Sequence, residues 1–284
     1  MTSWHEDLLD PLHATATEHH LTEPVLISDM SWGLVDTVVL HVRDGEREVV
    51  VKAAGSANHH IGREITAHER WTGPLLAVGA APRLLAADRD ARLIITAYLP
   101  GRLVEGTPAE HETDVHQQAG ELLARFHDQH HETDADLEGR ATERSLAWLA
   151  GDHRIAPDHE RQARAVLADH PHLPREVTPT HGDYQPRNWL LDGATVRVID
   201  FGRAALRPPA TDLCRLAVRQ WRHRPALEAA FLTGYGTDPR TEPQWSIDLL
   251  REAIGTACWA YQVGDGAFEA EGHRLLADAL ARFA

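Results

Sequence analysis

The sequence predicts an α+β fold with two lobes: a small N-terminal lobe built on an antiparallel sheet, and a larger, mainly helical C-terminal lobe. Strand-like apolar runs separated by turn residues fill the first third of the chain. Helical periodicity dominates after residue 100. Leu99-Pro100-Gly101, which ends regular structure, separates the two parts. We therefore assign residues 1–99 to one lobe and residues 100–284 to the other.

The N-terminal lobe is expected to begin with an amphipathic helix over residues 4–20, which Pro24 ends. Asp44-Gly45 predicts a hairpin turn between two strands. A helix capped by Asn58 is expected to run to about Thr72, where a Gly-Pro pair stops it. The strands are expected at Val25–Asp29, Thr37–Arg43, Arg47–Ala54, Arg83–Ala87 and Arg92–Tyr98.

The C-terminal lobe is expected to be helical, with a loop and short strands inserted at residues 178–201. A sheet-rich lobe packed on a helical one leaves a cleft between them, where ligands commonly bind. The helices are expected at residues 110–131, 142–150, 157–169, 209–221, 223–235, 243–262 and 267–282.

Composition and charge exclude several functions. The chain has 284 residues with 43% hydrophobic and 25% charged residues, which is typical of a globular protein. A formal net charge of −15 argues against binding nucleic acid or anionic membranes. Cys214 and Cys258 suit a reducing compartment and lack metal-ligand spacing. Since we find neither a secretory signal nor a spanning apolar stretch, we expect a cytoplasmic protein.

Acidic residues are concentrated between Glu110 and Glu138, where nine acids accompany a single arginine, Arg125. Two interpretations remain open. The acids could belong to a solvated helix and the acidic loop that follows it. Alternatively, they could form a negative rim that attracts a cationic, polyamine-like substrate by electrostatic steering.

The strongest functional signal is His181-Gly182-Asp183-Tyr184-Gln185-Pro186-Arg187-Asn188, followed twelve positions later by Asp200. Phosphoryl transfer from a nucleotide requires a carboxylate that accepts a hydrogen bond from the attacking hydroxyl, and oxygen ligands for Mg²⁺. Asp183 and Asn188 are five residues apart, so one loop can present both. Asp200 follows the apolar strand Val196–Ile199 and therefore projects from a rigid element.

Lys52 is the only lysine of the chain, although Lys and Arg together number 28. It lies in the strand-like segment Glu48–Ala53, directly after three valines. A compact ammonium fits between phosphate oxygens and a carboxylate in a way that a planar guanidinium does not. Kinases hold phosphates with a lysine on such a strand, paired with a helix glutamate. Chance survival in an arginine-rich composition is the alternative.

Together these residues resemble the aminoglycoside phosphotransferase and choline kinase branch of the protein-kinase-like fold, over most of the chain. The resemblance implies that Asp183 is the catalytic base or orients the hydroxyl. It implies that Asn188 and Asp200 bind Mg²⁺. It also implies that Lys52 contacts the α- and β-phosphates of ATP or GTP. The partner of Lys52 is expected to be Glu64, in Arg63-Glu64-Ile65-Thr66-Ala67, with Glu69 as the alternative.

The resemblance also implies supporting roles. His181 would brace the catalytic loop, and Asp212 would hydrogen-bond its backbone or cap a helix. The backbone of a hinge would bind the adenine, and the hinge residues are Ala97, Tyr98 and Leu99.

A phosphate-covering loop is expected between Asp29 and Thr37, with Gly33 as its flexible point. This segment has one glycine where a glycine-rich cover has several, and backbone approaches phosphate most closely at glycine. Phosphate contacts are therefore expected from Ser31 or from fewer backbone amides.

The acceptor pocket of this family comes from the C-terminal helices, which draws attention to residues 259–271. The stretch has aromatic and acidic side chains that could bind a sugar or an ammonium group. An aromatic helix core with surface acids explains it equally well. The candidate substrate residues are Trp259, Tyr261, Asp265, Glu269 and Glu271.

The resulting expectation is a Mg²⁺-dependent O-phosphotransferase that moves the γ-phosphoryl group of ATP or GTP to a hydroxyl of a cationic antibiotic of the aminoglycoside type, conferring resistance or self-resistance. One alternative is a metabolic or nucleoside-antibiotic kinase with another small-molecule acceptor. Another is a nucleotide-binding pseudokinase. A protein kinase is disfavoured because Ala204 to Pro209 leaves almost no segment for docking a peptide.

Overall fold

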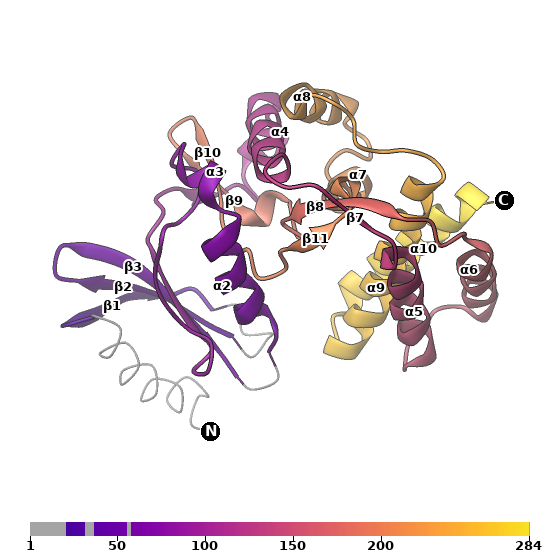
Figure 1. Ribbon diagram of the computed structural model, residues 1–284, viewed down its shortest axis with the longest axis horizontal. Helices are drawn as coiled ribbons and strands as arrows, with labels where there is room; N and C mark the ends of the chain where they lie inside the picture. The colour runs from indigo at the N-terminus through magenta and orange to yellow at the C-terminus, as the bar shows by residue number, and fades with distance from the viewer. Residues whose placement is uncertain (1–20, 32–36, 56–57, 284) are drawn as a thin grey trace.

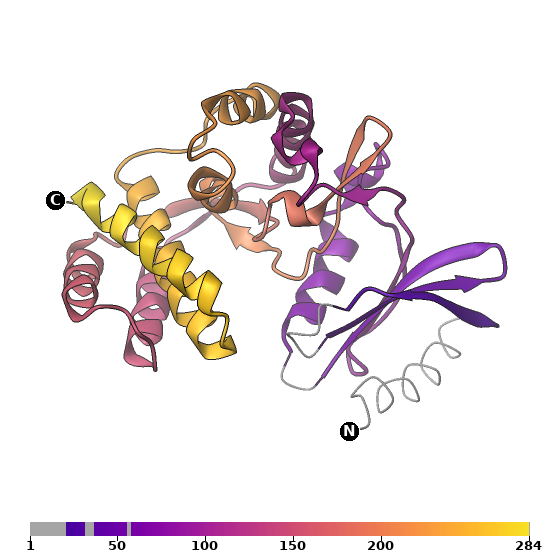
Figure 2. The ribbon, with the colours of Figure 1, turned by 180° about the vertical axis from the view of Figure 1, so that it is seen from behind.

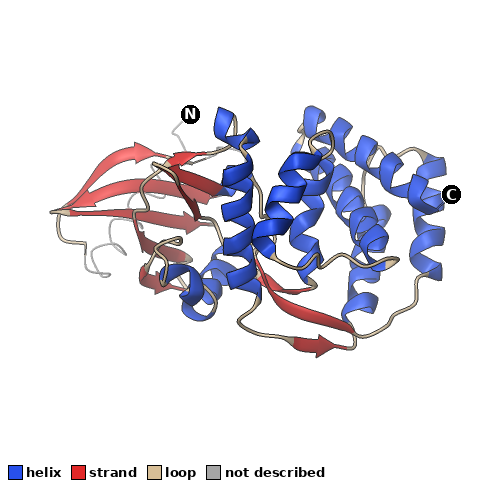
Figure 3. Ribbon diagram, turned by 90° about the horizontal axis from the view of Figure 1, so that it is seen from above, coloured by secondary structure: helices blue, strands red, loops and turns tan. Residues whose placement is uncertain are grey.

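The computed structural model describes residues 21–31, 37–55 and 58–283. The described chain has a mixed α+β fold, with an antiparallel sheet in its N-terminal part and helices in its C-terminal part, as predicted. Figures 1 and 3 show the large sheet at one end of the molecule and the helices at the other. The helix expected over residues 4–20 lies outside the described residues.

The N-terminal sheet has five strands in the order β1-β2-β3-β5-β4, and every neighbouring pair is antiparallel. Gly45, at φ +64°, lies in the hairpin between the second and third strands, as its sequence predicts. All five strands are found within a residue or two of their predicted bounds. They are β1 (Pro24–Asp29), β2 (Thr37–Asp44), β3 (Arg47–Ala54), β4 (Leu84–Asp88) and β5 (Leu93–Ala97).

Helix α2 (His60–Arg70) packs on this sheet through Ile61 and Ile65, which are buried against Ile94 of β5. The side-chain oxygen of Asn58 accepts a hydrogen bond from the N–H of His60 at 2.7 Å, so it satisfies one of the free donors at the helix start. The predicted Gly-Pro stop also begins a further short helix, α3 (Gly73–Leu76), because proline is tolerated in a first turn.

The C-terminal part is dominated by helices that pack in pairs. Helix α4 (Thr113–His127) packs against α8 (Pro225–Tyr235), and α9 (Gln244–Val263) packs against α10 (Gly266–Leu280), a pair visible in Figures 1 and 2. None of the described helices is long and apolar enough to cross a bilayer. The remaining helices are α5 (Leu137–Ala150), α6 (Pro157–Asp169), α7 (Cys214–Val218) and the short 3₁₀ turns η1 (Pro108–His111), η2 (Pro186–Asn188), η3 (Pro209–Leu213) and η4 (Ala281–Phe283).

Two small antiparallel sheets hold the segment with the strongest functional signal. Strand β8 (Arg175–Thr180) pairs with β7 (Glu132–Asp134) and β11 (Ala205–Arg207). Strand β9 (Trp189–Asp192) pairs with β10 (Thr195–Val198) and β6 (Arg102–Leu103). Residues 181–188 run from β8 to β9, and Asp200 follows β10 by two residues. The loop is therefore anchored in sheet at both ends.

Close helix packing in the C-terminal part depends on glycine. A Cβ atom built on Gly120 of α4 would lie 2.1 Å from the carbonyl oxygen of Phe231 in α8. A Cβ on Gly234 of α8 would lie 2.0 Å from the carbonyl oxygen of Gln117 in α4. Both distances are shorter than any real contact, so the backbones of these helices touch where the two glycines lie.

We therefore expect Gly120→Ala to destabilise the protein by about 1–3 kcal/mol, since the added methyl group must push α8 away. Gly255→Ala is the matched control, because Gly255 lies within α9 and a Cβ there meets nothing within 4 Å. This control should stabilise the protein by about 0.5–1 kcal/mol, as alanine is the better helix residue. Urea denaturation of both variants checks the prediction, and equal effects at the two positions would contradict it.

Candidate active site

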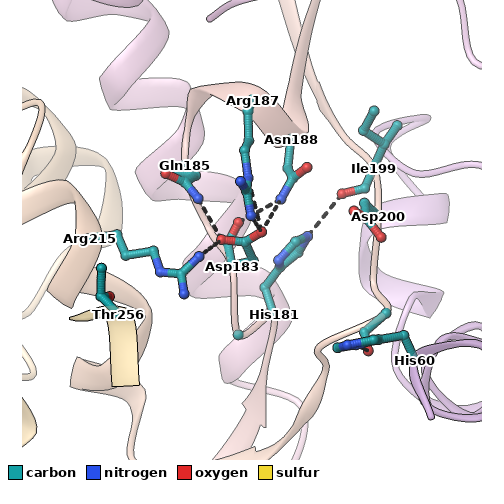
Figure 4. A network of polar contacts seen from close by, with 12 residues as sticks. His60, His181, Asp183, Gln185, Arg187, Asn188, Ile199, Asp200, Arg215 and Thr256 are labelled. Atoms are coloured by element: carbon teal, nitrogen blue, oxygen red, sulfur yellow. Dashed lines mark hydrogen bonds and ion pairs between the residues drawn. The ribbon is translucent and has the colours of Figure 1, made fainter. Parts of the chain in front are cut away.

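Asp183 lies at the centre of the loop between β8 and β9 and is 4% exposed. Its Oδ1 accepts hydrogen bonds from Gln185 Nε2 at 2.5 Å and from the guanidinium of Arg215. Its Oδ2 accepts from Arg187 Nε and from Asn188 Nδ2, each at 3.1 Å. Figure 4 shows these donors converging on the carboxylate. Both oxygens of Asp183 are therefore engaged by neighbouring side chains.

Arginine controls the charge state of Asp183. Burial by itself would raise the pKa of the carboxyl group, but the guanidinium groups of Arg215, Arg187 and Arg203 outweigh burial and hold that pKa well below its usual range. Asp183 is therefore a carboxylate at any physiological pH, and it can accept a hydrogen bond from a hydroxyl group.

The loop that carries Asp183 is fixed by a second buried carboxylate. Asp212 accepts the backbone N–H groups of His181 at 2.7 Å and Gly182 at 2.6 Å. His127 Nε2 donates to the same carboxylate at 3.0 Å. Gly182 has φ +79°, and a Cβ there would lie 2.4 Å from the carbonyl oxygen of Arg203. Asp212 thus binds the loop backbone; the residue that caps η3 is Pro208.

His181 connects this loop to the segment that leads to Asp200. Its Nε2 donates to the carbonyl oxygen of Ile199 at 3.0 Å, and its ring lies edge-on to that of Tyr184. The ring is 1% exposed. Through these contacts His181 holds the loop of Asp183 against the segment that leads to Asp200.

Asn188 and Asp200 present oxygen atoms from neighbouring segments. Asn188 donates its Nδ2 to the backbone carbonyl of Asp183 at 2.8 Å, which leaves its side-chain oxygen available. Asp200 has φ +64°, a left-handed conformation that Asp adopts more readily than most residues. Its side chain is 47% exposed. An amide oxygen and a carboxylate form a hard donor set of the kind that Mg²⁺ accepts alongside water and phosphate oxygens.

The described residues contain no cluster of three or more His, Cys, Asp or Glu side chains able to enclose a metal. A site built on Asn188 and Asp200 needs no such cluster, because Mg²⁺ keeps several waters and substrate oxygens in its coordination shell. The donor set therefore fits the metal that the sequence predicts.

Lys52 on β3 reaches across to the C-terminal part. Its Nζ lies 2.7 Å from Glu64 Oε2 of α2 and 2.8 Å from Asp200 Oδ1. Burial by itself disfavours the charged ammonium, but the two carboxylates outweigh burial and raise the pKa of Lys52. Of the two glutamates considered, Glu64 is the one in contact, while Glu69 lies on the outer side of α2 and pairs with Arg89 at 2.6 Å.

The expected hinge follows β5. Ala97 donates its backbone N–H to the carbonyl of Arg83 at 2.8 Å, and Tyr98 donates to the carbonyl of Glu48 at 2.9 Å. The Tyr98 ring stacks on His41 with centroids 3.9 Å apart. The backbone N–H of Leu99 has no acceptor among the described residues.

The expected phosphate-covering loop is described only at its start. Ser31 accepts the N–H of Val39 with its hydroxyl at 3.0 Å and donates its own N–H to Asp29 Oδ1 at 2.9 Å. The hydroxyl of Ser31 therefore supports β2 and retains one proton to donate. Gly33 lies outside the described residues.

The candidate substrate residues have separate surroundings. Trp259 packs edge-on against Phe268, and Tyr261 lies under the Arg154 guanidinium at 4.9 Å. Asp265 caps α10 by accepting the N–H of Phe268 at 3.0 Å.

The two glutamates of that set differ in their connection to the catalytic loop. Glu269 is 6% exposed and lies 3.4 Å from Arg154. Glu271 pairs with Arg219 at 3.2 Å and lines a cavity of about 400 Å³. Arg219 in turn donates to Gln185 Oε1 at 3.0 Å. Glu271 is thus joined to the loop of Asp183 through Arg219.

The acidic stretch from residue 110 to residue 138 does not form a uniform surface. Both interpretations of it assumed exposed acids, and Glu138 is instead 1% exposed. Its carboxylate binds Arg175 at 2.6 Å, Arg251 at 2.8 Å and His170 at 2.9 Å. Glu138 therefore joins α5, β8 and α9 within the C-terminal part.

Sequence patterns missed several residues around Asp183. Arg215 and Gln185 contact the carboxylate, and Arg203 lies close enough to lower its pKa. The sequence spacing of these three residues does not indicate that they lie near Asp183. Arg187, which lies in the same loop, also contacts Asp183. The run Arg203-Ala204-Ala205-Leu206-Arg207, which begins three residues after Asp200, was the available signal, as it places two arginines close in sequence to a metal-type carboxylate.

Comparisons with known proteins agree with this geometry. The model of the phosphotransferase enzyme family matches residues 31–245. No curated protein sequence matches the chain significantly.

Several solved structures share the whole fold. Choline kinase LicA from Streptococcus pneumoniae has 14% identity and a TM-score of 0.70, covering 98% of this chain and 99% of its own. A thermostable mutant of aminoglycoside phosphotransferase APH(4)-Ia, in ternary complex with ADP and hygromycin B, has 15% identity and a TM-score of 0.70, covering 100% and 99%. Macrolide 2′-phosphotransferase MphH from Brachybacterium faecium has 21% identity and a TM-score of 0.58, covering 94% and 97%.

The likeness to these structures shows the protein-kinase-like fold, and the family model covers well over half of the sequence. The chain belongs to the phosphotransferase enzyme family.

Proposed function

We propose that this protein transfers the γ-phosphoryl group of ATP, or of GTP, to a hydroxyl group of a small molecule with the help of Mg²⁺. The observation that carries the proposal is the meeting of Lys52, from the N-terminal sheet, with Asp200, beside the loop of Asp183 and Asn188. Phosphoryl transfer depends on positioning and electrostatic stabilisation. In this set Asp183 can accept a hydrogen bond from the substrate hydroxyl, Lys52 can contact phosphate, and Asn188 and Asp200 can bind the metal.

The reaction forms a bond between the acceptor oxygen and the γ-phosphorus and breaks the bond from that phosphorus to the β–γ bridging oxygen, which leaves with the nucleoside diphosphate. Asp183 accepts the hydrogen bond of the attacking hydroxyl and aligns its oxygen. As the bond to phosphorus forms, the hydroxyl proton passes to Asp183 and from there to solvent, which returns Asp183 to the carboxylate form. Mg²⁺, held by Asn188 and Asp200, would neutralise phosphate charge.

The nucleotide would lie between the proposed lobes, residues 1–99 and 100–284. Lys52 would contact the α- and β-phosphates, and Glu64 would keep its ammonium in place. The free N–H of Leu99 suits an acceptor nitrogen of adenine, with Ala97 and Tyr98 supplying neighbouring backbone. Ser31 can still donate its hydroxyl proton to a phosphate.

A cationic antibiotic of the aminoglycoside type is one candidate acceptor. The net charge of −15 and the fold shared with a hygromycin B complex support it. A different small-molecule hydroxyl, such as that of an amino alcohol, sugar or nucleoside antibiotic, is the second candidate. The fold shared with a choline kinase and a macrolide phosphotransferase supports this wider class. The full set of Lys52, Asp183, Asn188 and Asp200 favours an enzyme over a pseudokinase.

A coupled assay of nucleoside diphosphate release tests the function. Purified protein, Mg²⁺ and ATP or GTP would be combined with aminoglycosides, other antibiotics, amino alcohols and sugars. We expect release that depends on one compound, accompanied by a phosphorylated product, and lost when EDTA removes the metal. Lack of nucleotide binding by the intact protein would overturn the proposal.

Asp183→Asn should lower kcat by about 10²–10⁴, because the amide cannot take the hydroxyl proton. Its KM for nucleotide should change little, since Asp183 does not contact the phosphates in the proposed arrangement. Asp192→Asn is the matched control: Asp192 is paired with Arg197 in the neighbouring hairpin, and this variant should keep full activity. Steady-state kinetics of both variants test this prediction. An Asp183→Asn enzyme that keeps its activity would contradict the proposed role of Asp183 in taking the hydroxyl proton.

Lys52→Arg should lower kcat/KM for the nucleotide by about 10²–10³, as the larger guanidinium cannot fit between Glu64 and Asp200 while touching phosphate. Glu64→Gln should produce a smaller loss of the same kind. Steady-state rates at varied nucleotide concentration give kcat/KM for both variants. Glu69→Gln, on the outer side of α2, is the control. A loss in Glu69→Gln as large as in Glu64→Gln would refute this pairing.

A further inference from the structure

Two arginines near Asp183 form no ion pair with any carboxylate that the structure describes; the carboxylates of Asp183 and Glu252 act on Arg203 only electrostatically. Arg203 makes no hydrogen bond or ion pair with any other residue that the structure describes, and Arg207 makes only a long contact of 3.4 Å to the hydroxyl of Thr180. Both side chains are partly buried. A Cβ built on Gly182 would lie 2.3 Å from Arg207 Nη1, so this guanidinium rests directly against the catalytic loop.

Partly buried cations without partners are unfavourable, because they lose hydration and gain no ion pair. Burial lowers the pKa of Arg207 to about 10. Burial also lowers the pKa of Arg203, and the nearby charge of Arg215 lowers it further. An anion bound between these side chains would remove the unfavourable contribution.

The hydrogen bonds of Asp183 also indicate that an anion must bind near this residue. A carboxylate has about four lone-pair sites, and Asp183 receives donors from Gln185, Arg215, Arg187 and Asn188. A substrate hydroxyl can bind only after one donor leaves. Arg215 has a second carboxylate partner, since its Nε lies 2.6 Å from Glu252 Oε1 of α9. Arg215 can therefore leave Asp183 and remain anchored.

The positive charge lies away from the groups that serve the nucleotide. In Figure 4, Arg215 and Thr256 are on one side of Asp183, and Ile199 and Asp200 are on the other. Arg203 interacts electrostatically with Arg215 and with Glu252 of α9. Arg207 also interacts electrostatically with Glu252, so both cations lie near α9, one of the C-terminal helices where an acceptor would bind, whereas Lys52 contacts Asp200.

We propose that the acceptor carries an anionic group, a carboxylate or a phosphate, close to the hydroxyl that is phosphorylated, and that Arg203, Arg207 and Arg215 bind this group. The inference rests on the proposed function and specifies its acceptor class. The anion draws Arg215 away from Asp183, and the freed Oδ1 accepts the hydrogen bond of the neighbouring hydroxyl. Binding of the correct acceptor and exposure of the catalytic carboxylate are then a single event.

Anion binding can be measured without knowing the acceptor. The full-length protein would be saturated with Mg²⁺ and AMP-PNP, so that the γ-phosphate position is filled. Sodium phosphate, sodium tartrate and kanamycin would then be titrated at constant ionic strength, with melting temperature as the readout. We expect saturable stabilisation by phosphate or tartrate and none by kanamycin. The tighter of the two anions indicates whether the acceptor carries a phosphate or a carboxylate.

The variant Arg203→Gln/Arg207→Gln should weaken anion binding at least tenfold. Without anion it should melt higher than the wild type by about 2 °C, because two unpaired charges are removed. Arg222→Gln is the matched control, since Arg222 pairs with Asp278 away from Asp183 and its loss should leave anion binding unchanged.

Stabilisation by kanamycin but not by the anions would overturn the inference. Equal anion binding by the wild type and the double variant would also overturn it, as the ion would then bind elsewhere. Failure of AMP-PNP to bind would count against the proposed function instead. In that case the anion titration is repeated without nucleotide on the Lys52→Gln variant. Stabilisation of this variant by the anions, and its loss when Arg203→Gln and Arg207→Gln are added, would support anion binding by these arginines.

Discussion

The buried carboxylate of Asp212 is the constraint on which the catalytic geometry depends. It binds two consecutive N–H groups of the loop and one imidazole, so a single side chain fixes the direction of the chain at Gly182. His127 is in turn held by the hydroxyl of Tyr235 at 2.8 Å. This network joins α4, α8 and η3 to the loop. The position of Asp183 is therefore set by a network that reaches helices α4 and α8, whose close packing depends on Gly120 and Gly234.

The charges around Asp183 show how stability and function oppose each other in this protein. Arg215 and Arg187 bind the buried carboxylate directly, whereas Arg203 and Arg207 form no ion pair with a described residue, although Arg203 also lowers the pKa of Asp183. A fold optimised for stability alone would not retain two such cations beside a loop already supplied with arginine. The net charge of −15 is a property of the whole chain, whereas four arginines, Arg187, Arg203, Arg207 and Arg215, lie around the loop of Asp183.

The sequence predicted those parts of the site that lie on short segments with characteristic spacing. Asp183 and Asn188 share one loop, and Lys52 occupies a strand whose apolar pattern is unmistakable. The choice of Glu64 over Glu69 also follows from helix periodicity, because Glu64 shares the inner face of α2 with Ile61 and Ile65. The arginines could not be predicted in this way. Arg215 reaches Asp183 from 32 residues away, through the packing of η3 and α7, and no local pattern encodes that contact.

The same limit applies to the charged residues of the sequence. Glu138 belongs to the most acidic stretch of the sequence, yet it is buried by Arg175 and Arg251 and contributes to packing. Conversely, Arg203 has no distinguishing pattern in the sequence and lies close to the carboxylate of Asp183. A charged side chain affects recognition only when the fold leaves it without an internal partner. Among the described residues near Asp183, Arg203 and Arg207 form no ion pair, and electrostatic complementarity therefore favours the proposed acceptor with an anionic group.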